Sequence, residues 1–159
     1  MKNELLFNQL KVDKATKLDW EAILGLLKET GLAFWLSGRE NYRNYFIVKI
    51  KKKIIACFAL DLNKKAGILK SFAISKKLQG KGIGKMIVSK ILKIAKELGL
   101  NKLYASSWEA ANFWKKMNFK EIKLNQTKNS YFLKYVRYLN KNFPRFKNKT
   151  KHFLLIVNP

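Results

Sequence analysis

A glycine-rich loop between an apolar strand and an amphipathic helix constrains the fold of this chain most strongly. The helix is predicted over residues 83–98, because apolar residues recur there every three or four positions: Ile83, Ile87, Ile91, Ile94 and Leu98. Gly99 follows as a helix stop. Apolar runs at 67–74 and 102–106 predict strands on either side. A strand–helix–strand unit of this kind predicts that the two strands pair in parallel.

The same patterns predict the other elements. Further helices are expected over 15–30, 108–117 and 130–140. Further strands are expected over 45–50, 54–60, 119–124 and 152–157, with residues 32–44 as a loop or short helix. The order α-β-β-β-α-β-α-β-(α)-β predicts a mixed α/β sheet flanked by helices. With 159 residues and no linker or repeat, we expect one domain over 1–159.

Single cysteine and histidine residues limit the chemistry. Cys57 lies in an apolar run, which favours a small buried side chain over a nucleophile, and His152 is distant in sequence. One cysteine allows no internal disulfide and no cysteine metal cluster, so we expect no metal. The chain shows neither a signal-peptide pattern nor an apolar run long enough for a membrane span. We therefore expect a cytoplasmic protein that does not enter the membrane.

The formal net charge of +24 is uneven, since no Asp or Glu follows Glu121. Such a field attracts polyanions, and nucleic acid is one possible partner. However, only four of the 34 basic residues are arginine, the side chain preferred for forked phosphate contacts. This lysine-rich composition favours an A/T-rich genome over selection for an anionic partner, although both interpretations remain open.

The loop residues Gly80, Gly82 and Gly84 suit a phosphate group. Backbone without side chains can direct successive N–H groups into one concavity at a helix N-terminus, where the helix dipole also favours an anion. Lys81 and Lys85 add positive charge. A P-loop is excluded because Met86 follows Gly84-Lys85 where a Ser or Thr is needed. The Gly-x-Gly-x-Gly spacing and mid-chain position also differ from the dinucleotide fingerprint.

The loop instead resembles the Arg/Gln-x-x-Gly-x-Gly/Ala signature of the GNAT acetyltransferase superfamily, through Gln79-Gly80-Lys81-Gly82-Ile83-Gly84. Phe72-Ala73-Ile74 resembles the strand end whose backbone pairs with pantetheine in that family. Ser107-x-x-Ala110-x-x-Phe113-Trp114-x-x-x-Asn118-Phe119 resembles a second family motif, so the resemblance covers roughly 45–122. It implies a GNAT fold with acetyl-CoA as cosubstrate, bound by Phe72, Ala73, Ile74, Gln79, Gly80, Lys81, Gly82, Ile83, Gly84 and Lys85.

The resemblance is incomplete at the residues that move protons. The family's tyrosine position is Trp114, and a glutamate common near the start of the third strand is replaced by Gly67-Ile68. Candidate catalytic residues are Ser106, Ser107 and Glu109. Glu109 can instead be a first-turn helix carboxylate, and the serines can cap the next helix. Tyr104 and Tyr131 are further acid candidates that we expect to be packing residues.

The acceptor is the least constrained part of the prediction. The layout resembles small amino-acid acetyltransferases such as N-acetylglutamate synthase and arsinothricin acetyltransferase. Arg39 and Arg43 can then bind a substrate carboxylate, or simply be solvated. One alternative is a polyanionic or protein acceptor, aminoacyl-tRNA or a ribosome-associated protein, contacted by the aromatic and basic segment 123–151. Another is a module that binds acyl-CoA or RNA without turnover. We expect a monomer or homodimer.

Overall fold

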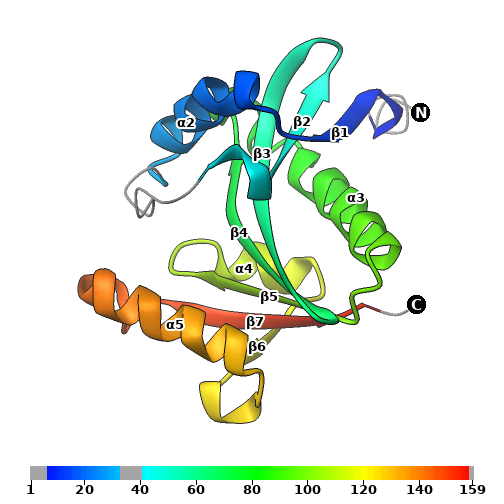
Figure 1. The fold of residues 1–159 in the computed structure, drawn as a ribbon. Helices are drawn as coiled ribbons and strands as arrows, with labels where there is room; N and C mark the ends of the chain where they lie inside the picture. The colour runs from blue at the N-terminus through cyan, green and yellow to red at the C-terminus, as the bar shows by residue number, and fades with distance from the viewer. Residues whose placement is uncertain (1–6, 33–40, 158–159) are drawn as a thin grey trace. The chain divides into compact units, whose positions relative to one another are not determined.

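The computed structural model describes residues 7–32 and 41–157. In this part of the chain, seven strands form one sheet in the order β1-β2-β3-β4-β5-β7-β6 (Figure 1). The strands are β1 (Leu10–Lys14), β2 (Tyr45–Ile50), β3 (Lys53–Asn63), β4 (Ala66–Ile74), β5 (Lys102–Ser107), β6 (Lys120–Ile122) and β7 (Lys151–Ile156). The α-helices are α2 (Trp20–Glu29), α3 (Ile83–Glu97), α4 (Ala111–Lys116) and α5 (Ser130–Asn142). The predicted mixed α/β class is confirmed.

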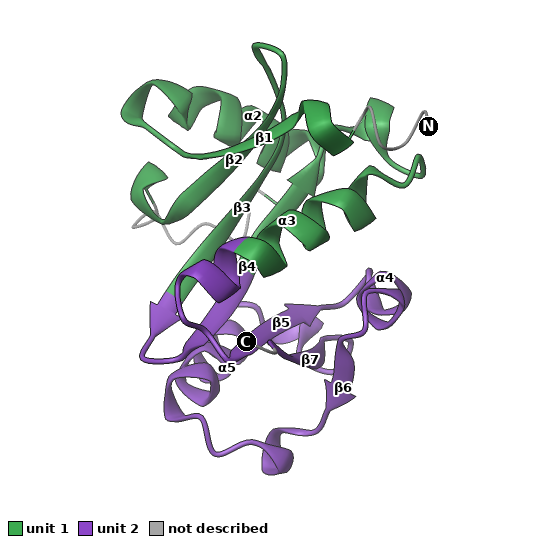
Figure 2. Cartoon of the chain, turned by 90° about the vertical axis from the view of Figure 1, so that its right-hand side faces the viewer, with its two compact units in different colours: residues 1–61, 70–93 green, residues 62–69, 94–159 purple. Residues whose placement is uncertain are grey.

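The chain divides into two compact units (Figure 2). The first contains residues 1–61 and 70–93, and the second contains residues 62–69 and 94–159. Strands β3 and β4 and helix α3 each contribute residues to both units. The expectation of a single domain stays a prediction.

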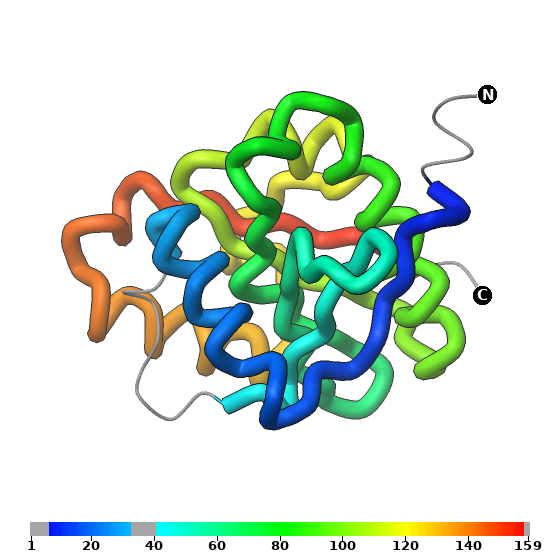
Figure 3. The backbone as a smooth tube through the Cα atoms, turned by 90° about the horizontal axis from the view of Figure 1, so that it is seen from above, coloured from blue at the N-terminus to red at the C-terminus, as the bar shows by residue number. Residues whose placement is uncertain are grey.

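In the first unit, β1, β2 and β3 are antiparallel neighbours, as the tube in Figure 3 traces. The hairpin between β2 and β3 turns at Lys51 and Lys52, and Lys51 has φ +55°. Strand β1 was not predicted, because only Leu10 of its five residues is buried and the alternation is weak. Strand β1 instead depends on its pairing with β2, which runs from Leu10 opposite Ile50 to Lys14 opposite Phe46.

Helix α2 begins five residues later than the predicted start at 15. A 3₁₀ turn precedes it, and there the Asp19 carboxylate accepts hydrogen bonds from the Thr16 N–H and hydroxyl at 2.8 and 2.7 Å. These hydrogen bonds, led by the backbone one, lower the pKa of Asp19. Leu18 lies in this 3₁₀ turn at helical spacing from the apolar residues of α2, but it is 94% exposed and does not join their buried face. The buried residues of α2 are Ile23, Leu26 and Leu27, which pack against β2 and β3.

Helix α3 confirms the strongest sequence pattern. Its buried residues are Ile83, Ile87, Val88, Ile91 and Ala95. Leu98, predicted to extend the stripe, follows the last helical residue and is 46% exposed. Gly99 ends the helix with φ +70°, a conformation that residues other than glycine rarely adopt.

In the second unit, the predicted parallel pair is present. Residues Ala66–Leu69 of β4 pair in parallel with Lys102–Ala105 of β5. The other edge of β5 pairs antiparallel with β7, which in turn pairs with β6. Helix α5 packs on this sheet through Phe132 and Val136, and Phe132 stacks on Tyr104 at 4.3 Å between ring centroids.

Helix α4 is shorter than the predicted helix 108–117. It begins at Ala111, so Trp108 and Glu109 precede it. The Ser107 hydroxyl oxygen accepts a hydrogen bond from the Ala110 N–H at 2.9 Å, which holds these residues in a turn. A residue pattern with period 3.6 fits such a turn as well as a first helical turn, so the sequence alone misplaced the start.

Among the residues that the structure describes, no helix is long and apolar enough to cross a membrane. The same residues contain no cluster of three or more histidine, cysteine or acidic side chains that could hold a metal ion.

Candidate active site

The N-terminus of α3 has the geometry of an anion site. Gly80 and Gly82 have φ of +72° and +78°, which only glycine adopts without strain. Hydrogen bonding of the helix begins at Met86, whose N–H donates to the Gly82 carbonyl at 3.4 Å. The N–H groups of the first turn therefore have no carbonyl partner within the helix. Since the dipole of a 15-residue helix points the same way, these groups can hold a phosphate oxygen.

The space and charge around this loop also suit a phosphate. A Cβ atom built on Gly80 or Gly82 would meet no atom within 4 Å, so the backbone is open on that side. The first turn of α3 contains no acidic residue, and Lys85 lies in that turn. The residues present therefore fit the pyrophosphate of a coenzyme A molecule.

The Gln79 side chain stabilises the loop itself. Its Nε2 donates a hydrogen bond to the Ile74 carbonyl at 2.8 Å, which ties the loop to the end of β4. Lys81 reaches back in the same way, and its Nζ donates to the Lys77 carbonyl at 2.7 Å. Glu29 of α2 fixes the preceding turn, since its Oε1 accepts the N–H of Lys76 at 2.7 Å. These contacts fix the loop before any ligand binds.

The end of β4, Phe72-Ala73-Ile74, leads directly into this loop. Ala73 is buried, whereas Phe72 and Ile74 are partly exposed. Ser71, just before them, has φ +50°, so the backbone leaves regular strand geometry there. The assignment of these three residues to pantetheine stays a prediction.

The candidate residues Ser106, Ser107 and Glu109 lie at the end of β5 in the second unit. Ser107 is not the N-cap residue of α4, which is Ala110, so its expected capping role is wrong. Its hydroxyl oxygen instead holds the turn before the helix by accepting the Ala110 N–H. The expectation that Glu109 lies in the first turn of a helix is wrong, because the helix starts two residues later, and Glu109 is exposed. Ser106 differs from both, since its hydroxyl lies 2.8 Å from Nδ1 of His152.

His152 is the functional candidate that sequence reasoning missed. It is partly buried at the start of β7, directly opposite Ser106 in the antiparallel register. Its ring meets the Phe132 ring edge-on, with 5.8 Å between centroids. Burial lowers the pKa of His152 below its ordinary value, which keeps the imidazole neutral at pH 7. Only the register brings residues 46 positions apart together, so no motif could have identified the pair.

The remaining acid and nucleophile candidates are packing residues. Tyr104 is buried, and its hydroxyl pairs with the Thr127 hydroxyl at 2.9 Å, as expected of a core tyrosine. Tyr131 packs against the same core. Trp114 is buried between Phe113 and Phe119, with ring centroids 5.1 and 5.0 Å away. The packing roles of Tyr104 and Tyr131 were expected from the sequence.

Cys57 is also a core residue. It is fully buried, and burial raises the pKa of its thiol to about 12. A thiolate is therefore not available at neutral pH, and the expected role as a small buried side chain is confirmed.

The proposed acceptor residues lie outside or at the edge of the described structure. Arg39 falls outside the described residues. Arg43 is exposed, and its guanidinium carbon lies 5.9 Å from the centre of the Tyr42 ring. Neither observation shows a carboxylate site, so both assignments stay predictions.

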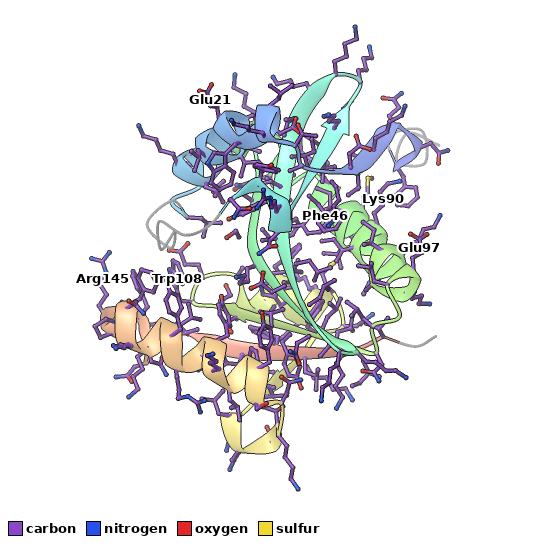
Figure 4. The ribbon with its side chains drawn as sticks, in the orientation of Figure 1. Glu21, Phe46, Lys90, Glu97, Trp108 and Arg145 are labelled. Carbon is purple, nitrogen blue, oxygen red and sulfur yellow. The ribbon has the colours of Figure 1, made fainter. Side chains whose placement is uncertain are left out.

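The aromatic and basic segment 123–151 contributes Phe146 and Arg145 to a stack with Trp108. The Trp108 and Phe146 rings stack with 4.6 Å between centroids, and the Arg145 guanidinium carbon lies 4.7 Å from the centre of the Phe146 ring. Figure 4 labels two of these three residues, Trp108 and Arg145. Tyr131 and Tyr135 instead pack against the core that contains Phe132 and Val136. Lys151 pairs with Glu121 at 3.3 Å.

Comparisons with known proteins agree with this fold. A family model described as the acetyltransferase (GNAT) family matches residues 12–119. An uncharacterized N-acetyltransferase of Chlorobaculum tepidum is 30% identical over 84 residues, which covers 52% of this chain and 54% of that protein. The chain therefore spans about half the length of this curated relative.

Two solved structures show the same architecture. N-acetylglutamate synthase from Neisseria gonorrhoeae, in complex with coenzyme A and N-acetyl-glutamate, has a TM-score of 0.72 at 17% identity, over 94% of this chain and 35% of that one. A Mycobacterium tuberculosis protein in complex with CoA has a TM-score of 0.69 at 19% identity, over 93% and 99%. At such identities these likenesses concern the fold alone. Because the family model spans more than half of the sequence, this chain belongs to the acetyltransferase (GNAT) family.

Proposed function

We propose that this protein is an acetyl-CoA-dependent N-acetyltransferase that acetylates the primary amine of a small, amino-acid-like molecule. The observation that carries the proposal is the N-terminus of α3, where Gly80 and Gly82 leave the backbone open beside the N–H groups of the first helical turn. Family membership supports the same cosubstrate.

In this proposal the loop and the end of β4 bind the cosubstrate. The backbone N–H groups of Gly82, Ile83 and Gly84 hold the pyrophosphate, and Lys81 and Lys85 add positive charge. The strand end 72–74 offers backbone groups to pantetheine. The Gln79 amide has a structural role here, because it already bonds the Ile74 carbonyl.

Acetyl transfer requires an unprotonated amine, so a group on the protein or water must accept a proton. Of the three candidates from sequence, we assign the contact with the reacting amine to Ser106. Ser107 holds the turn before α4, and Glu109 has an exposed position outside the helix. No step is assigned to a metal ion.

We propose an amino-acid-like acceptor because the fold resembles N-acetylglutamate synthase. A carboxylate on the acceptor would need a cation, and Arg39 and Arg43 are the candidates from sequence. The net charge of +24 would favour the encounter with any anionic acceptor.

A second candidate function has a polyanionic acceptor such as aminoacyl-tRNA. The observation in its favour is the stack of Trp108, Phe146 and Arg145, a combination of aromatic and cationic side chains that suits unpaired bases. The exposed Lys147 and Lys149 follow this stack.

One assay separates these functions. Free amino acids and charged tRNA are tested side by side as acceptors at about 0.15 M salt, where long-range attraction is screened beyond roughly 8 Å. Release of the CoA thiol measures turnover. We expect transfer to a free amine, with little loss when Lys147, Lys149 and Lys151 are all replaced by Gln. If tRNA is the better acceptor and the triple variant is inactive, the second candidate is correct. If acetyl-CoA binds without any turnover, the protein is a non-catalytic binding module.

A further inference from the structure

We propose that Ser106 and His152 form a hydrogen-bonded proton-transfer pair for acetyl transfer, with Ser106 contacting the reacting amine and His152 acting through Ser106. The inference rests on the proposed function and deepens it, because it assigns both proton transfers to one pair of residues. The two side chains meet directly, with 2.8 Å between the Ser106 hydroxyl oxygen and Nδ1 of His152.

The sheet fixes this pair. Ser106 and His152 are directly opposite in the antiparallel register of β5 and β7, which runs from Lys102–Ile156 to Ser107–Lys151. Directly opposed residues have their Cβ atoms about 4.5–5.5 Å apart, close enough for a hydroxyl to reach a ring nitrogen. Strand β7 also pairs with β6, so His152 lies on a central strand rather than an edge. Such a position restricts the ring before substrate binds.

Ser106 is also at the end of the parallel pairing. The register between β4 and β5 ends at Leu69 opposite Ala105, and Ser106 is the next residue. Ser106 is only partly buried. A hydroxyl at the carboxyl end of a parallel strand is in the region where ligands bind in open α/β sheets.

The surroundings of His152 favour the neutral ring. Opposite His152 on the two flanking strands are Ser106 and Ile122, and Phe132 of α5 contacts the ring edge. By register and packing, the titratable residues on this face are Tyr104 and Lys102 of β5, Lys120 of β6, and Tyr131 and Tyr135 of α5. Lys151 and Glu121 pair with each other, one residue along from His152 and Ile122. Burial lowers the pKa of His152, so the ring can accept a proton at neutral pH.

The proton transfers balance within the pair. The acceptor first loses one proton to solvent, and its neutral nitrogen then attacks the thioester carbonyl to form the new C–N bond. The attacking nitrogen passes its second proton to the Ser106 oxygen as the Ser106 hydroxyl proton moves to Nδ1 of His152. When the C–S bond breaks, the electron pair leaves with sulfur, and the proton returns from His152 through Ser106 to that sulfur. Both side chains end as they began.

This assignment accounts for both positions at which the sequence departs from the proton-transfer residues of the family. The pair takes the place of a proton acceptor that Gly67 and Ile68 cannot supply, and of a proton donor that the Trp114 indole cannot supply. Hydrogen-bond geometry suits the role, because a base must lie about 2.6–3.2 Å from the group that it deprotonates.

The test uses two variants and a matched control in the full chain. Ser106→Ala removes the hydroxyl. His152→Asn retains a hydrogen-bonding group near the position of Nδ1 but cannot take up a proton. Ser130→Ala, an exposed serine of the same unit at the start of α5, is the control. We expect kcat to fall about 10²–10⁴-fold in both variants, the range for loss of a general acid or base, with KM for acetyl-CoA unchanged.

The pH dependence separates proton transfer from packing. As pH falls through the pKa of His152, the wild-type ring becomes protonated and cannot accept a proton, so wild-type kcat should fall. The ratio of wild-type to His152→Asn kcat should then decrease toward one, and ionisation of the amine cancels in this ratio. His152 is the single histidine of the chain, so its NMR titration gives the same pKa without kinetics, provided no histidine tag is present.

Two different failures can be told apart. If acetyl-CoA neither stabilises the wild-type protein nor supports transfer to any amine, the proposed function is wrong. If wild-type protein transfers acetyl groups but His152→Asn matches it in kcat and in pH profile, the function stands and the Ser106–His152 assignment is overturned. A constant ratio between wild type and His152→Asn from pH 5 to 8 would overturn it as well.

Discussion

Substitution of Gly82 tests the phosphate site at the N-terminus of α3, and Gly99 provides a matched control. Both glycines have left-handed φ, +78° and +70°, and a Cβ built on either one meets no atom within 4 Å. Substitution to alanine should therefore cost the same stability at both positions, about 1–2 kcal/mol for an L-residue in this conformation. For a chain of this length that corresponds to a melting temperature lower by roughly 2–8 °C, at about 2–4 °C per kcal/mol.

Substitution of the same two glycines by glutamate should separate an effect on the stability of the fold from an effect on acetyl-CoA binding. At position 82 a carboxylate would occupy the open side of the N–H groups that we assign to the pyrophosphate. Two like unit charges about 4 Å apart repel by roughly 4 kcal/mol at an effective dielectric constant near 20, which is about a 10³-fold loss of affinity. Gly99→Glu puts the same charge after the other end of α3, where the dipole disfavours it by only about 0.3–1 kcal/mol.

The assay is thermal unfolding with and without acetyl-CoA. At a ligand concentration of about 100 Kd, binding stabilises the folded protein by roughly 2.7 kcal/mol. After a 10³-fold loss of affinity the same concentration should contribute less than about 0.1 kcal/mol. We expect the full shift in wild type and in Gly99→Glu, and no shift in Gly82→Glu. A full shift in Gly82→Glu would refute the assignment, and so would equal losses in both glutamate variants.

The remaining predictions concern single side chains. Trp114→Phe should reduce turnover less than Ser106→Ala, because Trp114 has a packing role; a larger loss in steady-state rate would reverse these roles. Tyr104→Phe should lower the free energy of unfolding by about 0.5–1.5 kcal/mol, the net value of one hydrogen bond, measured in urea; no change would contradict the bond to Thr127. Cys57 should resist iodoacetamide in the native protein at pH 8 and react in denaturant, because burial raises its pKa to about 12; fast native labelling would argue against its burial.

The lowered pKa of His152 predicts that the free energy of unfolding depends on pH. A group whose pKa is lower in the folded protein contributes stability that is complete above its unfolded pKa, about 6.5. That contribution should disappear as pH falls from the unfolded pKa through the folded one, and His152→Asn should lack this pH dependence. Urea unfolding of both proteins across this range measures the difference; identical curves would contradict the shift.

The sequence by itself determined the elements that have strong local signals. Isoleucines at helical spacing fixed α3, and Gly99 fixed its end, because both depend on residues close together in the chain. The glycine loop and its family likeness were readable for the same reason, since an anion site at a helix N-terminus uses contiguous backbone. The parallel pairing of β4 with β5 also followed, because the handedness of a strand–helix–strand connection leaves little choice.

The tertiary structure decided what depends on partners distant in sequence. Strand β1 has a weak pattern of its own and exists through pairing with β2, and Leu18 has helical spacing but nothing to pack against. The turn at Trp108 and Glu109 depends on the Ser107 hydroxyl rather than on propensity. The position of His152 depends most clearly on a partner that is distant in sequence. A one-residue change in register would place its side chain on the other face of the sheet, so only the actual pairing of β5 with β7 brings it to Ser106.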